Sequence, residues 1–276
     1  MIAGMTTKTE SRYIAVNSRR QHLRLGLMLV WVIIMPVTLY YFSPYLPFMG
    51  LGAGLISGSV FVFAGMFGSA IFLGRAFCGW LCPAGGTQDF AMLARPGQSN
   101  RRRLQWVKFG LWLPWLGAWI GLAISATGLR PDGLQADFFF QLENGISVSR
   151  PATYVIYLSV LTLILGISLI IGRRAFCHTA CWMAPFMVIG QKLGMILHLP
   201  GLHLSSQANK CTACGTCSSV CPMSLDVADW ARKRREEQNA PSTEPIPIAY
   251  HDCILCLRCA DACPAAVLHL GFGMRS

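Results

Sequence analysis

Charged side chains are scarce in this sequence, and carboxylates are the scarcest. Of its 276 residues only 13% are charged, with 12 Asp and Glu against 23 Lys and Arg, whereas 54% are hydrophobic. A soluble domain carries about 25% charged residues on average. The composition therefore indicates a membrane protein.

Several motifs of enzymes and of nucleic-acid-binding proteins are also missing. The chain has no glycine-rich dinucleotide fingerprint after a strand, no P-loop and no flavin-binding pattern. Its net charge of +11 is not accompanied by a nucleic-acid recognition motif. We therefore expect no nucleic-acid partner, and we attribute the basic residues to membrane topology.

Long stretches without Asp, Glu, Lys or Arg predict four transmembrane helices. A span needs roughly 20 mainly apolar residues, and the first charge-free stretch is long enough for two spans with a turn at SPYLP. A buried core helix is the alternative for any one run, but four such runs favour a membrane domain. We place the spans at about 25–42, 50–73, 109–129 and 151–172.

The basic residues predict how these spans are oriented. Lys and Arg are enriched in cytoplasmic loops, and here they gather in residues 1–24, between the second and third spans, and at Arg173 and Arg174 after the fourth. The segments on the other side hold only Arg130 and Arg150. We therefore expect both termini to be cytoplasmic, with a polar tail followed by an uncleaved first helix rather than a signal peptide.

Two cysteine runs near the end of the sequence have the spacing of a bacterial two-cluster ferredoxin. CTACGTCSSVCP begins at 211 and CILCLRCADACP at 253, and both read C-x2-C-x2-C-x3-C-P. In this pattern three cysteines of a run hold one [4Fe-4S] cluster and the fourth holds the other. The predicted ligands are Cys211, Cys214, Cys217 and Cys263 for cluster I, and Cys253, Cys256, Cys259 and Cys221 for cluster II.

Zinc sites and disulfides are the alternatives for these eight cysteines. Zinc sites usually pair two C-x2-C units at other spacings, and disulfides are rare in a cytoplasmic compartment. We therefore interpret residues 205–276 as a small α+β two-cluster ferredoxin domain, which suits electron relay. Residues 25–204 are predicted to form an all-α membrane domain of four transmembrane helices, arranged as two repeated hairpins.

A different cysteine motif occurs twice in the membrane part. RAFCGWLCPA begins at 75 and RAFCHTACWMA at 174, each just after a predicted span. Cys78 and Cys82, like Cys177 and Cys181, are four positions apart, which on a helix places both sulfurs on one face. The repetition predicts a duplicated helical hairpin that brings the two pairs face to face at the cytoplasmic edge of the membrane.

We expect these four cysteines to share one metal or redox centre. A [2Fe-2S] or [4Fe-4S] cluster and Cu(I) are all compatible with four thiolates. Redox-active dithiols, or thiols that only pack in a core, are the alternatives. All twelve cysteines of the chain fall in the motifs described here, which favours a shared centre.

The two copies differ after the second cysteine. Pro83 follows Cys82, but no proline follows Cys181 directly, so we expect the helix to continue past Cys181. Trp80 and Trp182 are predicted to anchor the chain at the membrane interface. Residues 183–204 are predicted to form a helix along that interface.

Three histidines after the fourth span are candidates for proton transfer with a quinol. Quinol oxidation needs a proton acceptor beside an apolar cleft, and His178, His198 and His203 lie near the predicted cytoplasmic surface. A structural or surface role is the more common alternative for a single histidine at such a place.

With these motifs the chain resembles the NapH and MauN type of membrane ferredoxin-like proteins. The shared pattern is four spans, a C-x3-C motif after the second and fourth, and a C-terminal pair of cluster runs. It covers nearly the whole chain, although only CGWLCP carries the proline of the family motif. NosR and CcoG are larger relatives with the same cysteine core. The resemblance implies a multi-pass protein of the bacterial cytoplasmic (inner) membrane, in contact with lipid and a redox partner protein.

The resemblance also implies membrane electron transfer, as a quinol dehydrogenase component or an electron carrier. Electrons would pass from quinol or a cytoplasmic donor, through two [4Fe-4S] clusters, to a partner redox protein, with quinone as a further ligand. The alternative is an assembly or reductase factor that supplies electrons or handles copper or thiols for a partner metalloenzyme. A purely structural anchor is a third hypothesis, but an anchor needs no redox centres.

Overall fold

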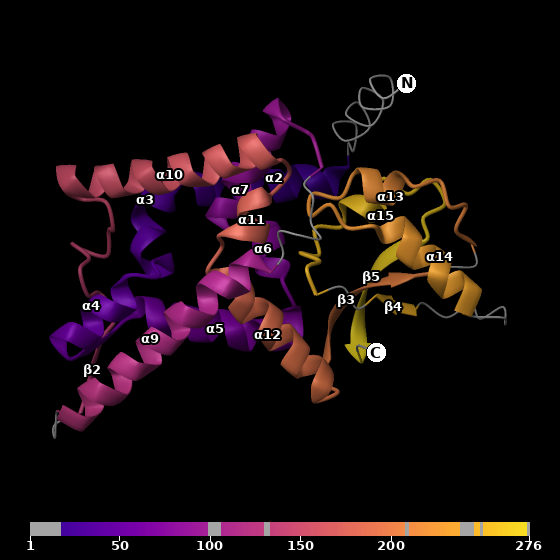
Figure 1. Ribbon diagram of the computed structural model, residues 1–276. Helices are drawn as coiled ribbons and strands as arrows, with labels where there is room; N and C mark the ends of the chain where they lie inside the picture. Colours follow the sequence, from indigo (N-terminus) through magenta and orange to yellow (C-terminus); the bar gives the residue numbers. More distant parts are fainter. Residues whose placement is uncertain are drawn as a thin grey trace.

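The computed structural model divides the chain into a helical part and a smaller part rich in cysteine. In Figure 1 the helices of the first part lie together on one side, and the three strands β3, β4 and β5 lie on the other with α13, α14 and α15. The structure describes residues 18–98, 106–129, 133–207, 210–237, 246–248 and 251–274.

Eleven helical segments and one small sheet make up the first part within these described residues. The two-stranded parallel sheet pairs β1 (Leu55–Ser57) with β2 (Gln135–Asp137). The helices are α2 (Arg19–Ile33), α3 (Met35–Thr38), η1 (Leu39–Phe42), α4 (Leu46–Ala53), α5 (Gly58–Leu73), α6 (Ala76–Trp80), α7 (Pro83–Ala94), α9 (Val107–Leu129), α10 (Pro151–Ile171), α11 (Ala175–Thr179) and α12 (Met183–Ile196).

Two helices in the described part of the chain are long and apolar enough to cross a membrane. They are α9 and α10, which match the third and fourth predicted spans. Only 6% of the apolar window of α9 and 11% of that of α10 is buried inside the molecule. Their side chains therefore present a large apolar surface outward, as expected for helices that contact lipid.

The first two predicted spans are not straight helices, and this corrects the sequence interpretation. α2 and the segment Met35–Phe42 meet at a bend of 59°. Together they form a third candidate span only if the two bent segments cross the membrane as one broken helix. Pro36 lies at the bend and lacks the N–H group that would continue the helix. The expected 50–73 helix is interrupted by β1 after Gly54, whose φ of 80° ends α4.

The helices that follow the two cysteine motifs each pack against a helix from the other half of the helical part. α12 packs along α5, while α7 packs against α10 and α2. A Cβ atom on Gly190 would lie 2.5 Å from the carbonyl oxygen of Phe67, and one on Gly194 would lie 2.6 Å from that of Ile71. Glycine at both positions therefore lets α12 approach α5 backbone to backbone, as small residues do in membrane helix pairs.

The second part is a three-stranded antiparallel sheet with short helices. The strand order is β4 (Ile246–Ile248), β3 (Pro200–Ser206) and β5 (Leu268–Met274). The helices are α13 (Thr216–Ser219), α14 (Val227–Glu237) and α15 (Arg258–Asp261). Because β3 pairs along its whole length with β5, this unit begins at Pro200 rather than at 205, and the predicted interfacial helix ends at Ile196.

Candidate functional site

The structure brings the eight ferredoxin-type cysteines into two groups of four. Each group lines a separate cavity, and each cavity takes three cysteines from one run and one from the other. Cys211, Cys214, Cys217 and Cys263 line the first cavity, and Cys253, Cys256, Cys259 and Cys221 line the second. These are the two crossed ligand sets that the spacing predicts.

The two runs follow the same local backbone path. φ is positive at Ala213 and Leu255, two residues after the first cysteine of each run, and again at Gly215 and Leu257 after the second. Such left-handed residues turn successive backbone N–H groups toward a concavity, an arrangement found at many iron–sulfur sites. Repeated turns of this kind therefore shape both loops around a cluster-sized space.

The donor set of each cavity fits a [4Fe-4S] cluster. Each cavity offers four thiols, and a cubane spreads its cysteine ligands over different irons. Among the described residues, no three His, Cys, Asp or Glu side chains lie close enough together to hold a single metal ion. The four thiols that line each cavity match the number of ligands that such a cluster needs.

The two cavities differ in their exposure to solvent. Cys214 is exposed, whereas Cys221, Cys256 and Cys259 are buried. Hydrogen bonds with Thr216 lower the pKa of Cys214, while burial raises the pKa of Cys217 to about 11. A thiol with a raised pKa keeps its proton at neutral pH until a metal displaces it. The first cavity thus opens toward solvent and the second is covered.

The two C-x3-C motifs adopt the same backbone path, but not the predicted one. Cys78 lies in α6 and Cys177 in α11, whereas Cys82 and Cys181 lie beyond these one-turn helices. The N–H of Cys82 donates to the carbonyl of Phe77 at 3.0 Å, and the N–H of Cys181 donates to that of Phe176 at 3.0 Å. The two cysteines of a motif therefore do not share one helix face.

The helix of the second motif ends before Cys181 although no proline follows that cysteine. The prediction that this helix continues past Cys181 is therefore wrong. α11 ends at Thr179 and α12 begins at Met183. The hydrogen bond from Cys181 reaches back five residues to Phe176 and closes the turn. The corresponding hydrogen bond, from Cys82 to Phe77, closes the turn of the first motif. Pro83 therefore reinforces a helix end that this hydrogen bond already defines.

The structure nevertheless places the four cysteines of the two C-x3-C motifs in one buried cluster. Cys78, Cys82, Cys177 and Cys181 are buried, carry no disulfide and belong to one apolar cluster. Gln88 donates from Nε2 to Cys177 Sγ at 3.2 Å, and Cys78 Sγ lies 3.3 Å from Met187 Sδ. We call this group the four-cysteine chamber.

The loop of the second cavity docks directly on the first C-x3-C motif. The indole N–H of Trp80 donates to the carbonyl of Leu255 at 3.0 Å. A Cβ atom on Gly79 would lie 2.1 Å from the carbonyl oxygen of Ile254, so only glycine allows this contact. Trp80 thus joins α6 to this loop, and the indole N–H of Trp182 donates to the Phe42 carbonyl at 2.7 Å. Their anchoring at a membrane interface stays a prediction.

A buried ion cluster fixes the same loop. Asp252, which precedes the first ligand of the second cavity, accepts from Arg75 at 2.8 Å and from Lys108 at 2.7 Å. Burial alone would raise the pKa of Asp252, but the two cations outweigh it and hold the pKa well below its usual range. The carboxylate therefore stays charged at any pH above its unfolded value of about 3.9.

Replacing Asp252 with asparagine should loosen this docking. Arg75 and Lys108 would stay buried without their carboxylate, which costs about 3–5 kcal/mol for a broken buried pair. We expect faster hydrogen exchange in residues 252–257 and a lower unfolding midpoint. Glu143→Gln is the control, because both side chains of the pair that Glu143 forms with Arg150 are exposed and such pairs contribute about 1 kcal/mol or less. Equal exchange in both variants would contradict the assignment.

A second buried carboxylate joins the two cysteine motifs. Asp89 on α7 accepts from Arg24 Nη1 at 2.7 Å and from Arg174 Nε at 2.6 Å. Arg174 also donates to the carbonyl of Cys78 at 2.8 Å, so the arginine of the second motif holds the backbone of the first. Arg24 was expected in a polar tail, yet it lies within α2 and is completely buried.

The three candidate histidines do not form one site. His178 is completely buried in α11, and His203 is buried in β3, where its Nδ1 lies 2.9 Å from the Gly201 carbonyl oxygen. His198 follows α12 and is exposed, with a φ of 50°. Their positions in different elements give no support to a shared proton-transfer site.

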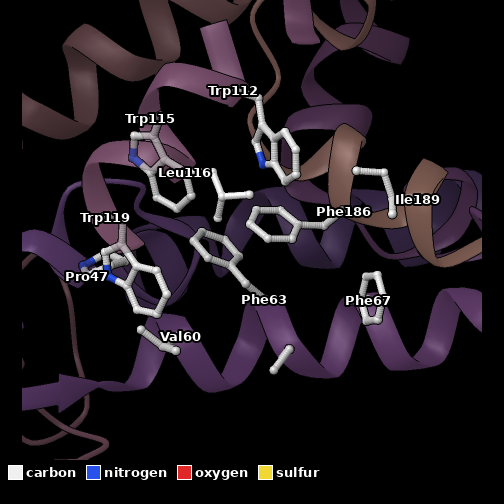
Figure 2. A pocket seen from close by; sticks show the side chains of 11 residues that line it. Pro47, Val60, Phe63, Phe67, Trp112, Trp115, Leu116, Trp119, Phe186 and Ile189 are labelled. Carbon is white, nitrogen blue, oxygen red and sulfur yellow. The ribbon is translucent and has the colours of Figure 1, made fainter. Parts of the chain in front are cut away.

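The largest apolar cavity that we describe lies between α5, α9 and α12. It has a volume of about 400 Å³, and Figure 2 shows its wall of aromatic side chains. Trp112, Trp115 and Trp119 come from α9 and face Phe63 and Phe67 on α5, with Phe186 from α12 between them. No ionisable side chain of the described residues lines it, and none of the three histidines does.

Sequence reasoning missed the residues that join the two parts of the molecule. The sequence analysis predicted an interfacial anchor at Trp80 and assigned no role to Gly79 or Asp252. The only feature of the sequence that pointed to these three residues is that each lies within two positions of a candidate cysteine ligand. Their role depends on a contact between segments far apart in the chain, which spacing does not reveal.

Comparison with known families supports the cysteine assignment. A family described as "4Fe-4S binding domain" matches twice, at residues 55–101 and 153–200, and thus covers both C-x3-C motifs. A family described as "4Fe-4S dicluster domain" matches residues 207–267. The two matches of the first family show that both cysteine motifs belong to similar segments.

Similar curated proteins come from three bacteria. The methylamine utilization ferredoxin-type protein MauN of Methylorubrum extorquens is 25% identical over 189 residues, 63% of this chain and 59% of the relative. MauN of Methylobacillus flagellatus is 25% identical over 199 residues, 70% of this chain and 64% of the relative. Escherichia coli YccM, named as an electron transport protein, is 24% identical over 203 residues, 71% of this chain and 51% of the relative.

These matches confirm the resemblance to MauN-type ferredoxin proteins that the motifs predict. The chain spans between half and two thirds of the length of these relatives. No solved structure matches the chain significantly.

Proposed function

We propose that this chain, which is similar to the MauN-type ferredoxin proteins, is a membrane iron–sulfur protein that transfers electrons to or from a redox partner protein. Its two family matches support 4Fe-4S binding and its relatives support ferredoxin-type electron transport. The observation that carries the proposal is the pair of cavities, each lined by four cysteines from both runs.

In this proposal the eight cysteines of the two runs ligate two [4Fe-4S] clusters. When bound, such a cluster accepts and releases one electron at a time. The protein holds the ligands in two short helices and left-handed turns, and it excludes water from the second cavity by docking that loop on α6. Exposed Cys214 marks the first cavity as the side open to a partner.

We further propose that the helical part lies in a bacterial cytoplasmic membrane, with both termini cytoplasmic and four passes. The outward apolar surfaces of α9 and α10 support membrane insertion. The broken segments Arg19–Phe42 and Leu46–Leu73 would supply the other two passes. The donor in this proposal is the quinol pool or a cytoplasmic carrier, and the acceptor is a partner redox protein.

The second candidate function is a factor that supplies electrons for maturation of a partner metalloenzyme. One observation favours it: the loop of the second cavity contacts the motif that holds Cys78, so electrons could serve thiol or copper chemistry in the four-cysteine chamber. Replacing Cys78 and Cys177 by alanine separates the two functions. Persistent quinol oxidation together with a metal-free partner enzyme would support the maturation role.

Iron analysis of single-cysteine variants tests the ferredoxin assignment. Anaerobically purified protein should hold about four fewer irons per chain after Cys217→Ala, and also after Cys259→Ala, because each change removes a ligand of one cluster. Electron paramagnetic resonance of the reduced protein should show loss of a different signal in each variant. Protein without any iron–sulfur signal after reduction would rule the proposal out.

A further inference from the structure

The second part of the molecule, which holds the two ferredoxin-type cavities, exposes its large hydrophobic side chains on one strand. Leu270, Phe272 and Met274 alternate along β5 and lie on one face of the sheet, because side chains two residues apart in a strand share a face. Phe272 is 64% exposed and Met274 is 65% exposed. Among residues 200–274 whose exposure the structure describes, no other large hydrophobic side chain is exposed.

The opposite face of β5 packs closely against β3. A Cβ atom on Gly271 would lie 2.7 Å from Ser205 Oγ and 3.0 Å from His203 Nε2, and both of these side chains are buried. On the apolar face the register places Leu270 opposite Leu204, which lines the second cavity. The apolar face of β5 therefore continues to the surface the layer of side chains that covers the second cavity.

The end of α12 extends this exposed apolar face. Ile196 is 72% exposed and Leu197 is 55% exposed. β3 starts soon after α12, and its first residue, Pro200, pairs with Met274, so the ends of α12 and β5 lie near each other (Figure 1). The five exposed side chains form what we call the apolar patch: Ile196, Leu197, Leu270, Phe272 and Met274.

The patch begins at the depth at which the membrane helices end. Gly194 approaches the carbonyl of Ile71, so α12 ends beside the end of α5, and β3 also contacts α5. α5 and α10 each lead into one of the two equivalent cysteine motifs, which meet in one buried cluster. The ends of these helices therefore lie at a similar depth, which in the proposed arrangement is the cytoplasmic interface of the membrane.

The charges near the patch suit anionic lipid head groups. The segments 183–206 and 264–276 contain no Asp or Glu, whereas each contains one strongly basic residue, Lys192 and Arg275. Lys192 is exposed and lies one turn before Ile196 on the same face of α12. A lysine in such a place covers apolar surface with its stem and extends its ammonium group to the head groups.

The free edge of β5 sets how deeply this strand can enter a membrane. In the sheet that the structure describes, β5 pairs with β3 alone, so its other edge has no strand partner. Unpaired backbone groups are excluded from the hydrocarbon core but are satisfied by water and head groups at the interface. β5 is therefore suited to the interface, where apolar faces insert about 5–10 Å into the boundary between head groups and acyl chains.

We propose that the apolar patch is a docking surface that inserts β5 and the end of α12 into the head-group region of an anionic lipid bilayer. The inference rests on the proposed membrane location of the helical part. Docking holds the second cavity beside the membrane, because Leu204 lines that cavity and lies opposite Leu270. The first cavity, with α13, lies away from the end of β5 (Figure 1), so exposed Cys214 stays accessible to a redox partner in water.

Photolabelling of the wild-type protein from the lipid side tests this proposal. The full-length, cluster-containing protein is placed in nanodiscs of phosphatidylcholine and phosphatidylglycerol, one copy per disc, with a phospholipid that carries a diazirine near the start of its acyl chain. After illumination, mass spectrometry should find label in α10 and in residues 192–197 and 268–274. It should find none in α14, which lies far from the end of β5 in Figure 1 although its Lys233 is also exposed and basic. Discs of phosphatidylcholine alone should give less label in residues 268–274.

A double substitution shows whether the label depends on the patch. Phe272→Ser combined with Met274→Ser should lower the label in residues 268–274 severalfold and leave the label in α10 and the iron content unchanged. Tyr45→Ser is the matched control, because Tyr45 is also 65% exposed but precedes α4 in the helical part. It should leave the label in β5 unchanged.

The pattern of label separates failure of the docking from failure of the proposed function. Label in α10 without label in β5 of the wild-type protein would overturn the docking, whether β5 is bare or covered by a second copy or another protein, and would leave the membrane location intact. Equal label in β5 of the wild-type protein and the double variant would overturn it as well. Absence of label from α10 would instead overturn the proposed membrane location.

Discussion

Asp89→Asn should be the most damaging single change outside the cysteines. Arg24 and Arg174 would be left completely buried without the carboxylate that both contact, and removing one partner of a buried ion pair costs about 3–5 kcal/mol. We expect a lower unfolding midpoint in detergent and loss of the packing that holds α7 against α2. Thermal unfolding followed by circular dichroism measures this effect.

An exposed carboxylate with the same connectivity provides the control. Asp229 also bridges two cations, Arg232 and Lys233, but all three side chains are reached by solvent. Asp229→Asn should leave the unfolding midpoint unchanged, since exposed ion pairs contribute little. If the two asparagine variants unfold at the same temperature, Asp89 does not have the structural role that we assign to it.

Gly79→Ala should displace the loop of the second cavity. The added Cβ would lie 2.1 Å from the carbonyl oxygen of Ile254 and 3.2 Å from its carbonyl carbon. The clashing atoms belong to the backbone, so the loop must move, and overpacking of this kind costs about 1–3 kcal/mol. We expect a changed paramagnetic resonance spectrum for the cluster of the second cavity and slower electron exchange with the membrane part.

Gly65→Ala is the matched control for this change. Gly65 lies in helix α5, and nothing is within 4 Å of the position that its Cβ would take. Alanine there should also favour the helix slightly, because it loses less conformational entropy than glycine. An unchanged spectrum in Gly79→Ala protein, with the same electron-exchange rate as in Gly65→Ala protein, would show that the docking contact is not required.

The ferredoxin part could be predicted in detail because its ligand spacing is a local property. A C-x2-C-x2-C-x3-C-P run sets the loop geometry by itself, and the second run repeats it with the same left-handed positions. The helices α9 and α10 were also predictable, because an uninterrupted apolar run of sufficient length determines each one.

The remaining differences have identifiable physical causes. The break at Pro36 was hidden by a charge-free run, since hydropathy does not report a missing backbone donor. The backbone turn at Cys181 is closed by a hydrogen bond from its N–H to the carbonyl of Phe176. Backbone hydrogen bonds of this kind cannot be inferred from the types of the residues. The contact of Gly79 with Ile254 is tertiary, and one sequence contains no signal for such a pair.

The crossed packing of the two motifs has a consequence for how the protein is made. α7 rests on α10, and α12 rests on α5, so each cysteine motif is supported by a helix from the other half of the chain. A ribosome that has synthesised only the first motif has produced α2, but not α10, the second helix against which α7 packs. The chamber is therefore complete only after Ile196 has left the ribosome, and any metal insertion there must follow synthesis of the whole helical part.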